Sequence, residues 1–246
     1  MYRGLEITPP FFELGPKGYM FGPEMLRLSI RADELSREYE VQIIIDPQYV
    51  DIPLIAQRVE RALVFAPHMD SLEPGRGQGA VLPEALKAAG AVGVVLNHVE
   101  RRLTREQLAL TIRRADQVGL ATVACSDDVE SAVSIAELAP NVIVVESPEL
   151  IGAGSAADRG NAAIGDINRA IWRVNPEIRV VHGAGIGCAR DVFDVMAAGA
   201  QGTGSSSGVC TAPDPEAMLG EMVRATRDGW DACHRGTRAL ERVTEV

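Results

Sequence analysis

The chain has 246 residues, of which 46% are hydrophobic and 24% charged, within the range of one large globular domain or two small ones. Its apolar runs are far shorter than the roughly 20 residues that cross a bilayer, which excludes a transmembrane protein. The net charge of −10 and the absence of any Lys/Arg cluster with interleaved aromatic residues indicate that nucleic acid is not a partner.

Short apolar or β-branched runs predict eight β-strands. In chain order these runs cover residues 11–14, 41–45, 62–66, 92–96, 121–124, 142–145, 180–181 and 202–205. The last run is the weakest, because it is rich in Gly and Ser. The runs are continuous rather than alternating in polarity, which is typical of parallel strands that are buried on both faces.

Helical patterns lie between the predicted strands. Leu28, Ala32 and Leu35 recur at helical spacing, and Thr104 with Gln107 forms a capping box before a further helix. Other helix starts are indicated by N-cap residues and prolines, at Pro23, Pro83, Ser126 with Asp127 and Asp128, and Asp214 before Pro215. Helix ends are indicated by Gly90, Gly119 and Gly199. A short helix is expected near residues 52–61, and an extra charged helix at about 227–246.

Eight strand–helix units predict a single (β/α)8 barrel domain of the α/β class over residues 1–246. An open doubly wound sheet usually has only five or six strands, and no Pro/Gly/Ser-rich linker divides the chain. The first residues lack the basic and apolar regions of a signal peptide, so we expect a cytoplasmic protein. The four cysteines show neither zinc-site nor disulfide spacing, and we expect reduced thiols and no metal.

In such a barrel the chemistry lies at the carboxyl ends of the strands. Lys17, His98 and Glu146 follow the first, fourth and sixth predicted strands, so they should face one mouth. Each also has an ordinary interpretation: Lys17 as a generic surface residue, His98 as a structural histidine, and Glu146 as the first polar residue of a loop. Gly-rich turns at 183–187 and 205–208 follow the seventh and eighth strands, where barrels frequently bind phosphate.

One segment favours a different class of protein. Residues 152–157 match the dinucleotide pattern G-x-G-x-x-A and would indicate a nucleotide-binding protein. However, six residues separate the preceding strand from the first glycine, whereas the fingerprint requires an immediate strand–turn–helix. The context therefore argues against nucleotide binding.

Four segments resemble the triosephosphate isomerase family, and especially its short archaeal members. They are VVLNHVERRLT at 94–104, VVESPELIGAG at 144–154, HGAGIGCARDV at 182–192 and GAQGTGSSSGV at 199–209. Residues 1–70 are less similar, with only Gly-Pro-Lys-Gly-Tyr at 15–19 similar to the Asn-x-Lys motif of the family. Gly15 stands where the family usually has Asn, and Val99 replaces a usual Ser.

The resemblance implies a metal-free and cofactor-free isomerase that interconverts dihydroxyacetone phosphate and glyceraldehyde 3-phosphate through an enediol(ate). It implies that Glu146 is the base, that neutral His98 polarises the carbonyl, that Lys17 holds the substrate anion, and that Glu100 organises Lys17 and His98. It also implies that the phosphate is bound by Ile151 and Gly152 in a mobile lid and by Gly185, Ser206 and Ser207.

The resemblance leaves the substrate open between a triose phosphate and a related tetrulose phosphate (erythrulose phosphate). A catalytically silent phosphate-binding barrel is a further alternative. The implied partners are a small phosphorylated sugar and further copies of the chain in a homodimer or homotetramer, with neither nucleic acid nor membrane.

Overall fold

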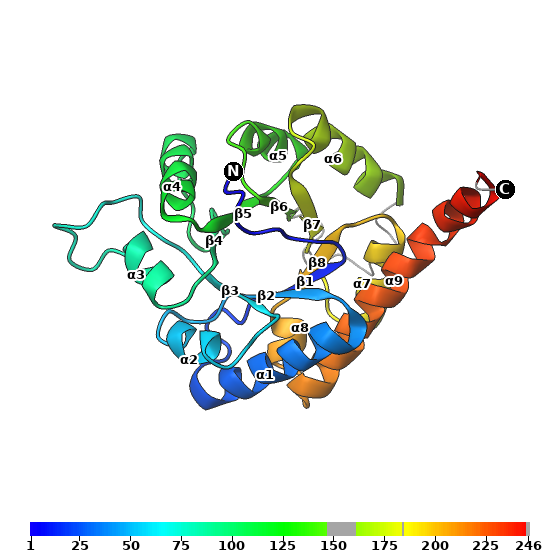
Figure 1. Cartoon of the computed structure of the whole chain (residues 1–246), viewed down its shortest axis with the longest axis horizontal. Helices are drawn as coiled ribbons and strands as arrows, with labels where there is room; N and C mark the ends of the chain where they lie inside the picture. Colours follow the sequence, from blue (N-terminus) through cyan, green and yellow to red (C-terminus); the bar gives the residue numbers. More distant parts are fainter. Residues whose placement is uncertain (147–160, 184, 245–246) are drawn as a thin grey trace.

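The chain forms a closed barrel of eight parallel strands surrounded by helices, seen in a computed structural model that describes residues 1–146, 161–183 and 185–244 (Figure 1). The strands are β1 (Phe11–Leu14), β2 (Gln42–Ile45), β3 (Leu63–Ala66), β4 (Gly93–Leu96), β5 (Ala121–Ser126), β6 (Val142–Val145), β7 (Arg179–His182) and β8 (Gly202–Ser205). They pair in sequence order, and β8 closes the barrel on β1. The predicted fold class and strand positions are confirmed.

The helices begin and end close to the predicted signals. They are α1 (Gly22–Tyr39), α2 (Ile52–Ala56), α3 (Pro83–Ala88), α4 (Arg105–Val118), α5 (Val129–Ala136), α6 (Asn161–Val174), α7 (Ala189–Ala197), α8 (Ser207–Cys210) and α9 (Pro215–Thr244). The capping box of Thr104 and Gln107 starts α4, and Gly119 ends it in the left-handed conformation with φ +81°. No helix in these ranges is both long and apolar enough to cross a membrane.

The prediction of a helix over 52–61 is wrong in its length, because α2 ends at Ala56. The carboxylate of Asp33, in α1, accepts hydrogen bonds from the backbone N–H groups of Glu60, Arg61 and Ala62 at 2.9, 2.6 and 2.8 Å. Three consecutive N–H groups that point at one oxygen atom cannot bond to carbonyl groups four residues earlier, as a helix requires. Asp33 therefore holds this segment in a loop that leads into β3.

Residues 227–244 do not form a helix of their own but continue α9, which begins at Pro215. Gly229, in the middle of this helix, marks a close approach to α7 rather than a break. A Cβ atom at Gly229 would lie 2.7 Å from both Met196 Cβ and the Phe193 carbonyl oxygen. Figure 1 shows α9 crossing α7 and α1, with its C-terminal end projecting beyond the barrel.

The barrel interior and the helix layer receive alternate side chains of each strand. In β1, Phe11 belongs to the interior cluster, whereas Phe12 and Leu14 pack under the helices. Phe11 and Glu13 pair with Gly202 and Gly204 of β8. A Cβ atom at Gly202 would lie 2.7 Å from the Phe11 ring, and one at Gly204 would lie 2.9 Å from Glu13 Cβ. The glycines that make β8 a weak strand signal thus leave room for the side chains of β1.

Candidate active site

A cavity of about 680 Å³ opens at the carboxyl ends of the strands. Its volume is within the range of small-molecule sites in proteins. The described residues that the sequence predicts for the site all line this cavity: Lys17, His98, Glu100, Glu146, Gly185, Ser206 and Ser207. Ile151 and Gly152, and with them the nucleotide-like pattern at 152–157, lie outside the described residues. The topology therefore brings residues from both ends of the chain to one opening.

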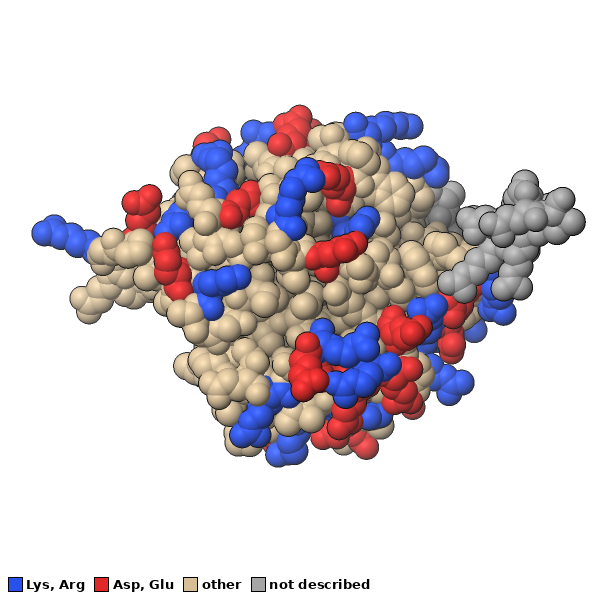
Figure 2. Space-filling model, in the orientation of Figure 1, with Lys and Arg blue, Asp and Glu red and all other residues tan. Residues whose placement is uncertain are grey.

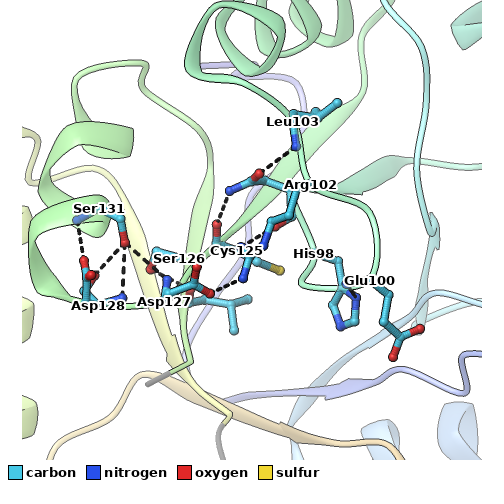
Figure 3. Close-up of polar contacts among 11 residues, drawn as sticks. His98, Glu100, Arg102, Leu103, Cys125, Ser126, Asp127, Asp128 and Ser131 are labelled. Atoms are coloured by element: carbon cyan, nitrogen blue, oxygen red, sulfur yellow. Dashed lines mark hydrogen bonds and ion pairs between the residues drawn. The ribbon is translucent and has the colours of Figure 1, made fainter. Parts of the chain in front are cut away.

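The loop after β4 carries His98 and is anchored by Asn97. The backbone of Asn97 is left-handed with φ +59°, which is uncommon for a residue other than glycine. Its side-chain amide donates to the Cys125 carbonyl oxygen at 2.9 Å and accepts from the Leu103 N–H at 3.0 Å. Arg102 also bonds to the Asn97 carbonyl and forms an ion pair with Asp127 (Figure 3). The position of His98 is thus set by contacts with the strand and loop next to it.

The imidazole of His98 is held in one tautomer. The backbone N–H of Glu100 donates a hydrogen bond to His98 Nδ1 at 3.2 Å (Figure 3). A backbone N–H is always a donor, so Nδ1 is the acceptor and the neutral ring carries its proton on Nε2. Burial and the Lys17 ammonium lower the pKa of His98 below 6.5. At neutral pH, His98 is therefore an uncharged hydrogen-bond donor.

Lys17 lies in the loop after β1, in a left-handed backbone conformation with φ +51°. The side chain of Gln48 donates to the Lys17 carbonyl oxygen at 2.6 Å, which fixes this turn. The ammonium lies 3.0 Å from Glu100 Oε1, and this contact lowers the pKa of the Glu100 carboxyl. Glu100 thus contacts Lys17 through its side chain and His98 through its backbone.

Glu146 comes directly after β6, where its backbone N–H donates to the Ser126 carbonyl oxygen at 2.8 Å. Gly183, the residue after β7, lies beside its carboxylate, because a Cβ atom there would be 3.8 Å from Glu146 Oε1. The negative charge of Glu146 also acts on the titration of His98 across the cavity. A carboxylate and a neutral imidazole therefore line one cavity from the loops after β6 and β4, two strands that are separated in the barrel by β5 alone.

The turns after β7 and β8 meet at the rim of the cavity. Gly185 is left-handed with φ +67°, and Ser205 Oγ donates to the Ile186 carbonyl oxygen at 2.9 Å. The hydroxyl of Ser206 bonds to the carbonyl oxygen of Gly15 and so ties this turn to the loop after β1. Ser207 begins α8 on the same rim. The two glycine- and serine-rich turns are therefore joined at one rim, at the ends of the seventh and eighth strands, where barrels frequently bind phosphate.

Sequence reasoning missed two acidic residues of the cavity, Glu13 and Asp46. Burial, followed by the charge of Glu146, raises the pKa of Glu13 from its ordinary value of 4.5 to about 7, against the opposing effect of Lys17. Burial and then Glu13 raise the pKa of Asp46 well above its usual range. Asp46 directly follows the Ile43–Ile45 run, just as Glu146 directly follows the Val142–Val145 run. This position after a predicted strand was the signal that could have identified Asp46 as a residue of the cavity.

The described part of the surface contrasts with the cavity. Lys and Arg side chains alternate with Asp and Glu over the face drawn in Figure 2, and neither sign forms a continuous patch there. Many of these charges are paired within one helix, as Arg31 is with Glu34 at 2.9 Å. The cavity, by contrast, brings four carboxyl groups together around Lys17: Glu13, Asp46, Glu100 and Glu146.

The fold and this cavity define a barrel enzyme with acid–base groups at its mouth. The family model described as "Triosephosphate isomerase" matches residues 24–221. A triosephosphate isomerase of Methanobacterium bryantii is 36% identical over 203 residues, covering 82% of this chain and 89% of that protein. One from Sulfolobus acidocaldarius is 34% identical over 222 residues, covering 89% and 95%. This chain belongs to the triosephosphate isomerase family and is an isomerase.

A solved structure supports the fold independently. The triosephosphate isomerase of Bartonella henselae superposes with a TM-score of 0.73, covering 90% of this chain and 100% of that chain at 15% identity. At this level of sequence identity, the superposition establishes the shared barrel fold alone. The family membership comes from the sequence matches, and the match to the family model begins at residue 24, within the first third of the chain, where the motifs were weak.

Proposed function

We propose that the chain interconverts dihydroxyacetone phosphate and glyceraldehyde 3-phosphate. The observation that carries this proposal is the placement of Glu146, neutral His98 and Lys17 around one cavity beside two joined glycine-rich turns. The names of the archaeal relatives support the same activity. No feature of the described residues favours a tetrulose phosphate or a silent barrel over this reaction.

In this reaction Glu146 takes a proton from the substrate carbon next to the carbonyl, and the electron pair of the broken C–H bond forms the enediol(ate). His98 donates its Nε2–H hydrogen bond to the carbonyl oxygen, which gains negative charge in that step. The proton then returns from Glu146 to the neighbouring carbon, and a hydroxyl proton moves to the former carbonyl oxygen. Substrate and product therefore have the same composition, and no external oxidant or reductant is needed.

Lys17 supplies positive charge to the phosphorylated substrate, and Glu100 holds the ammonium in place at 3.0 Å. The phosphate is assigned to the backbone of the turns at Gly185, Ser206 and Ser207, together with Ile151 and Gly152 from the segment after β6. Backbone N–H groups in such turns bind anions without a side-chain cation. The remaining parts of the proposal are a cytoplasmic, single-domain protein that assembles as a homodimer or homotetramer.

The test is an assay of the purified chain with each triose phosphate, with the product detected by a coupled dehydrogenase. We expect turnover in both directions, and Glu146→Gln should lower kcat by about 10²- to 10⁴-fold with a smaller change in KM. Glu34→Gln, which removes an exposed carboxylate of α1, is the control. A folded chain that turns over neither triose phosphate, or a Glu146→Gln variant with unchanged kcat, would overturn the proposal.

A further inference from the structure

Glu13 and Asp46 lie together at the floor of the cavity. Glu13 alternates with the interior residue Phe11 along β1, and its register partner on β2 is Ile44, also an interior residue. Asp46 is two residues beyond Ile44, so its side chain has the same inward direction. The rest of the floor is apolar or small, with Val95, Cys125, Val144 and Gly204 lining it. Two carboxyl groups therefore share the mainly apolar floor of the cavity.

Glycines provide the space for both groups. A Cβ atom at Gly204 would lie 2.7 Å from the Glu13 carbonyl oxygen, and one at Gly15 would lie 3.2 Å from Asp46 Oδ1. Asp46 Oδ1 is buried and has no hydrogen-bond partner among the described residues. A buried carboxyl oxygen without a partner is costly, and a bound ligand removes that cost when it supplies the missing hydrogen bond.

The charges around the pair limit how many protons it can lose. Asp46 directly follows the neighbouring strand β2 and Glu146 directly follows β6, and both carboxylates interact electrostatically with Glu13. Lys17 is the cation that opposes them, and it is already paired with Glu100. Among the described residues, the thiols of Cys125 and Cys210 also interact with the pair, and both have raised pKa values because of burial and these carboxylates. The cavity is lined as well by His68, His98 and Arg101. Two full negative charges beside Glu146 are unfavourable here, and a phosphorylated substrate makes them more so.

We propose that Glu13 and Asp46 form a proton-holding acid pair that binds an uncharged oxygen of the substrate's carbon chain through a neutral carboxyl group. A protonated carboxyl is both a donor and an acceptor of hydrogen bonds, so it fits a hydroxyl or carbonyl oxygen. This inference rests on the proposed function for the identity of the substrate. It adds two substrate-binding residues to the set of Glu146, His98 and Lys17.

Proton uptake follows from this arrangement. Burial raises the pKa of Glu13 to about 7, so the free pair carries more negative charge at pH 8 than at pH 6. An anionic ligand that requires the neutral carboxyl must draw a proton from the solvent when it binds at pH 8. At pH 6 that proton is already present, and binding needs none. The pair therefore links ligand affinity to pH above neutrality.

Calorimetry of glycerol 3-phosphate binding tests the pair without any turnover. Titrations at pH 8 in two buffers of different ionisation enthalpy should show uptake of up to about one proton by the wild-type chain. Glu13→Gln and Asp46→Asn keep hydrogen-bonding groups of the same shape and should reduce this uptake. Glu13→Gln should bind about tenfold more tightly than wild type at pH 8 and equally at pH 6, since its amide needs no proton. Glu34→Gln should behave as wild type at both pH values.

A second pair of variants separates substrate binding from a merely structural role. Asp46→Ala removes the hydrogen-bonding group and should raise the dissociation constant of glycerol 3-phosphate about tenfold at pH 6, whereas Asp46→Asn restores most of the affinity. Absence of binding, binding without proton uptake, or equal pH dependence in wild type and Glu13→Gln would overturn the inference. Proton-linked binding by a chain that does not turn over triose phosphates would support the pair and overturn the proposed function instead.

Discussion

The backbone N–H of Glu100 donates a hydrogen bond to Nδ1 of His98 at 3.2 Å, while the side chain of the same Glu100 lies 3.0 Å from the Lys17 ammonium. One residue thus fixes the tautomer of the imidazole and the position of the cation. The two groups belong to loops after β4 and β1, on different parts of the barrel rim. Their relative placement depends on Glu100, which is why its substitution is informative.

The tautomer of His98 can be observed directly. Nitrogen-15 NMR of the imidazole at pH 7 should show an unprotonated Nδ1 and a protonated Nε2. Since burial and Lys17 lower the pKa of His98, its titration midpoint should lie below 6.5. The neutral ring, which the proposed reaction requires, is then lost only on the acid side of that midpoint. A proton on Nδ1 at pH 7, or a midpoint above 6.5, would contradict this description.

Glu100→Gln should separate function from stability. The ion pair with Lys17 is exposed, with 62% of the Glu100 side chain accessible, so its loss should change the free energy of unfolding by less than about 1 kcal/mol. The ammonium loses its fixed partner, and we expect kcat/KM to fall by about tenfold. Kinetics and urea unfolding of the same preparation provide both measurements. Glu34→Gln breaks a comparable exposed ion pair on α1 and should alter neither quantity.

Glu13 should make the chain less stable as the pH rises. The folded state retains a proton on Glu13 up to about pH 7, whereas the unfolded chain loses it near the ordinary value of 4.5. The stabilising effect of that bound proton is complete below pH 4.5 and disappears as the pH rises through 7. Glu13→Gln should therefore exceed wild type in unfolding free energy by up to about 3 kcal/mol at pH 8 and match it near pH 4.5. Urea unfolding at both pH values provides the comparison, and a difference that does not change with pH would contradict it.

Asp33→Ala should destabilise the fold without changing the chemistry. The buried carboxylate accepts three backbone hydrogen bonds at the entry to β3, and its loss leaves these N–H groups without their partner. We expect a loss of about 2 to 4 kcal/mol in unfolding free energy, with kcat retained in the folded fraction. Asp33→Asn keeps an acceptor oxygen and should recover part of the loss. Equal stability of Asp33→Ala and wild type would show that water replaces the carboxylate.

The sequence predicts most of the barrel because local signals and tertiary packing agree there. The continuous apolar runs become the buried strands, and Thr104 and Gly119 bound α4 as expected. The end of α2 is set by Asp33, a residue of another helix, and no local pattern contains that information. Gly229 fits a helix end by composition, but its contact with α7 gives it another role.

The site shows the same division. His98 and Glu146 were found because each follows a clear strand and matches a family motif. Glu13 was missed because a single acidic residue inside a short strand is not a sequence motif. Whether its side chain points into the barrel or toward the helices becomes known only from the closed barrel. Asp46 was missed although it directly follows a strand, since no motif of the resemblance covers it.

The fit between β1 and β8 restricts how the interior can be redesigned. Positions 202 and 204 of β8 have room only for glycine, because Phe11 and Glu13 of β1 occupy the space that a larger side chain would need. A library that places larger residues in β8 alone would create steric clashes with β1. A library that places smaller residues in β1 alone would leave a cavity. Only paired substitutions, larger on one strand and smaller on the other, conserve the volume. Directed evolution of this pocket should therefore treat the first and last strands of the barrel as a single unit.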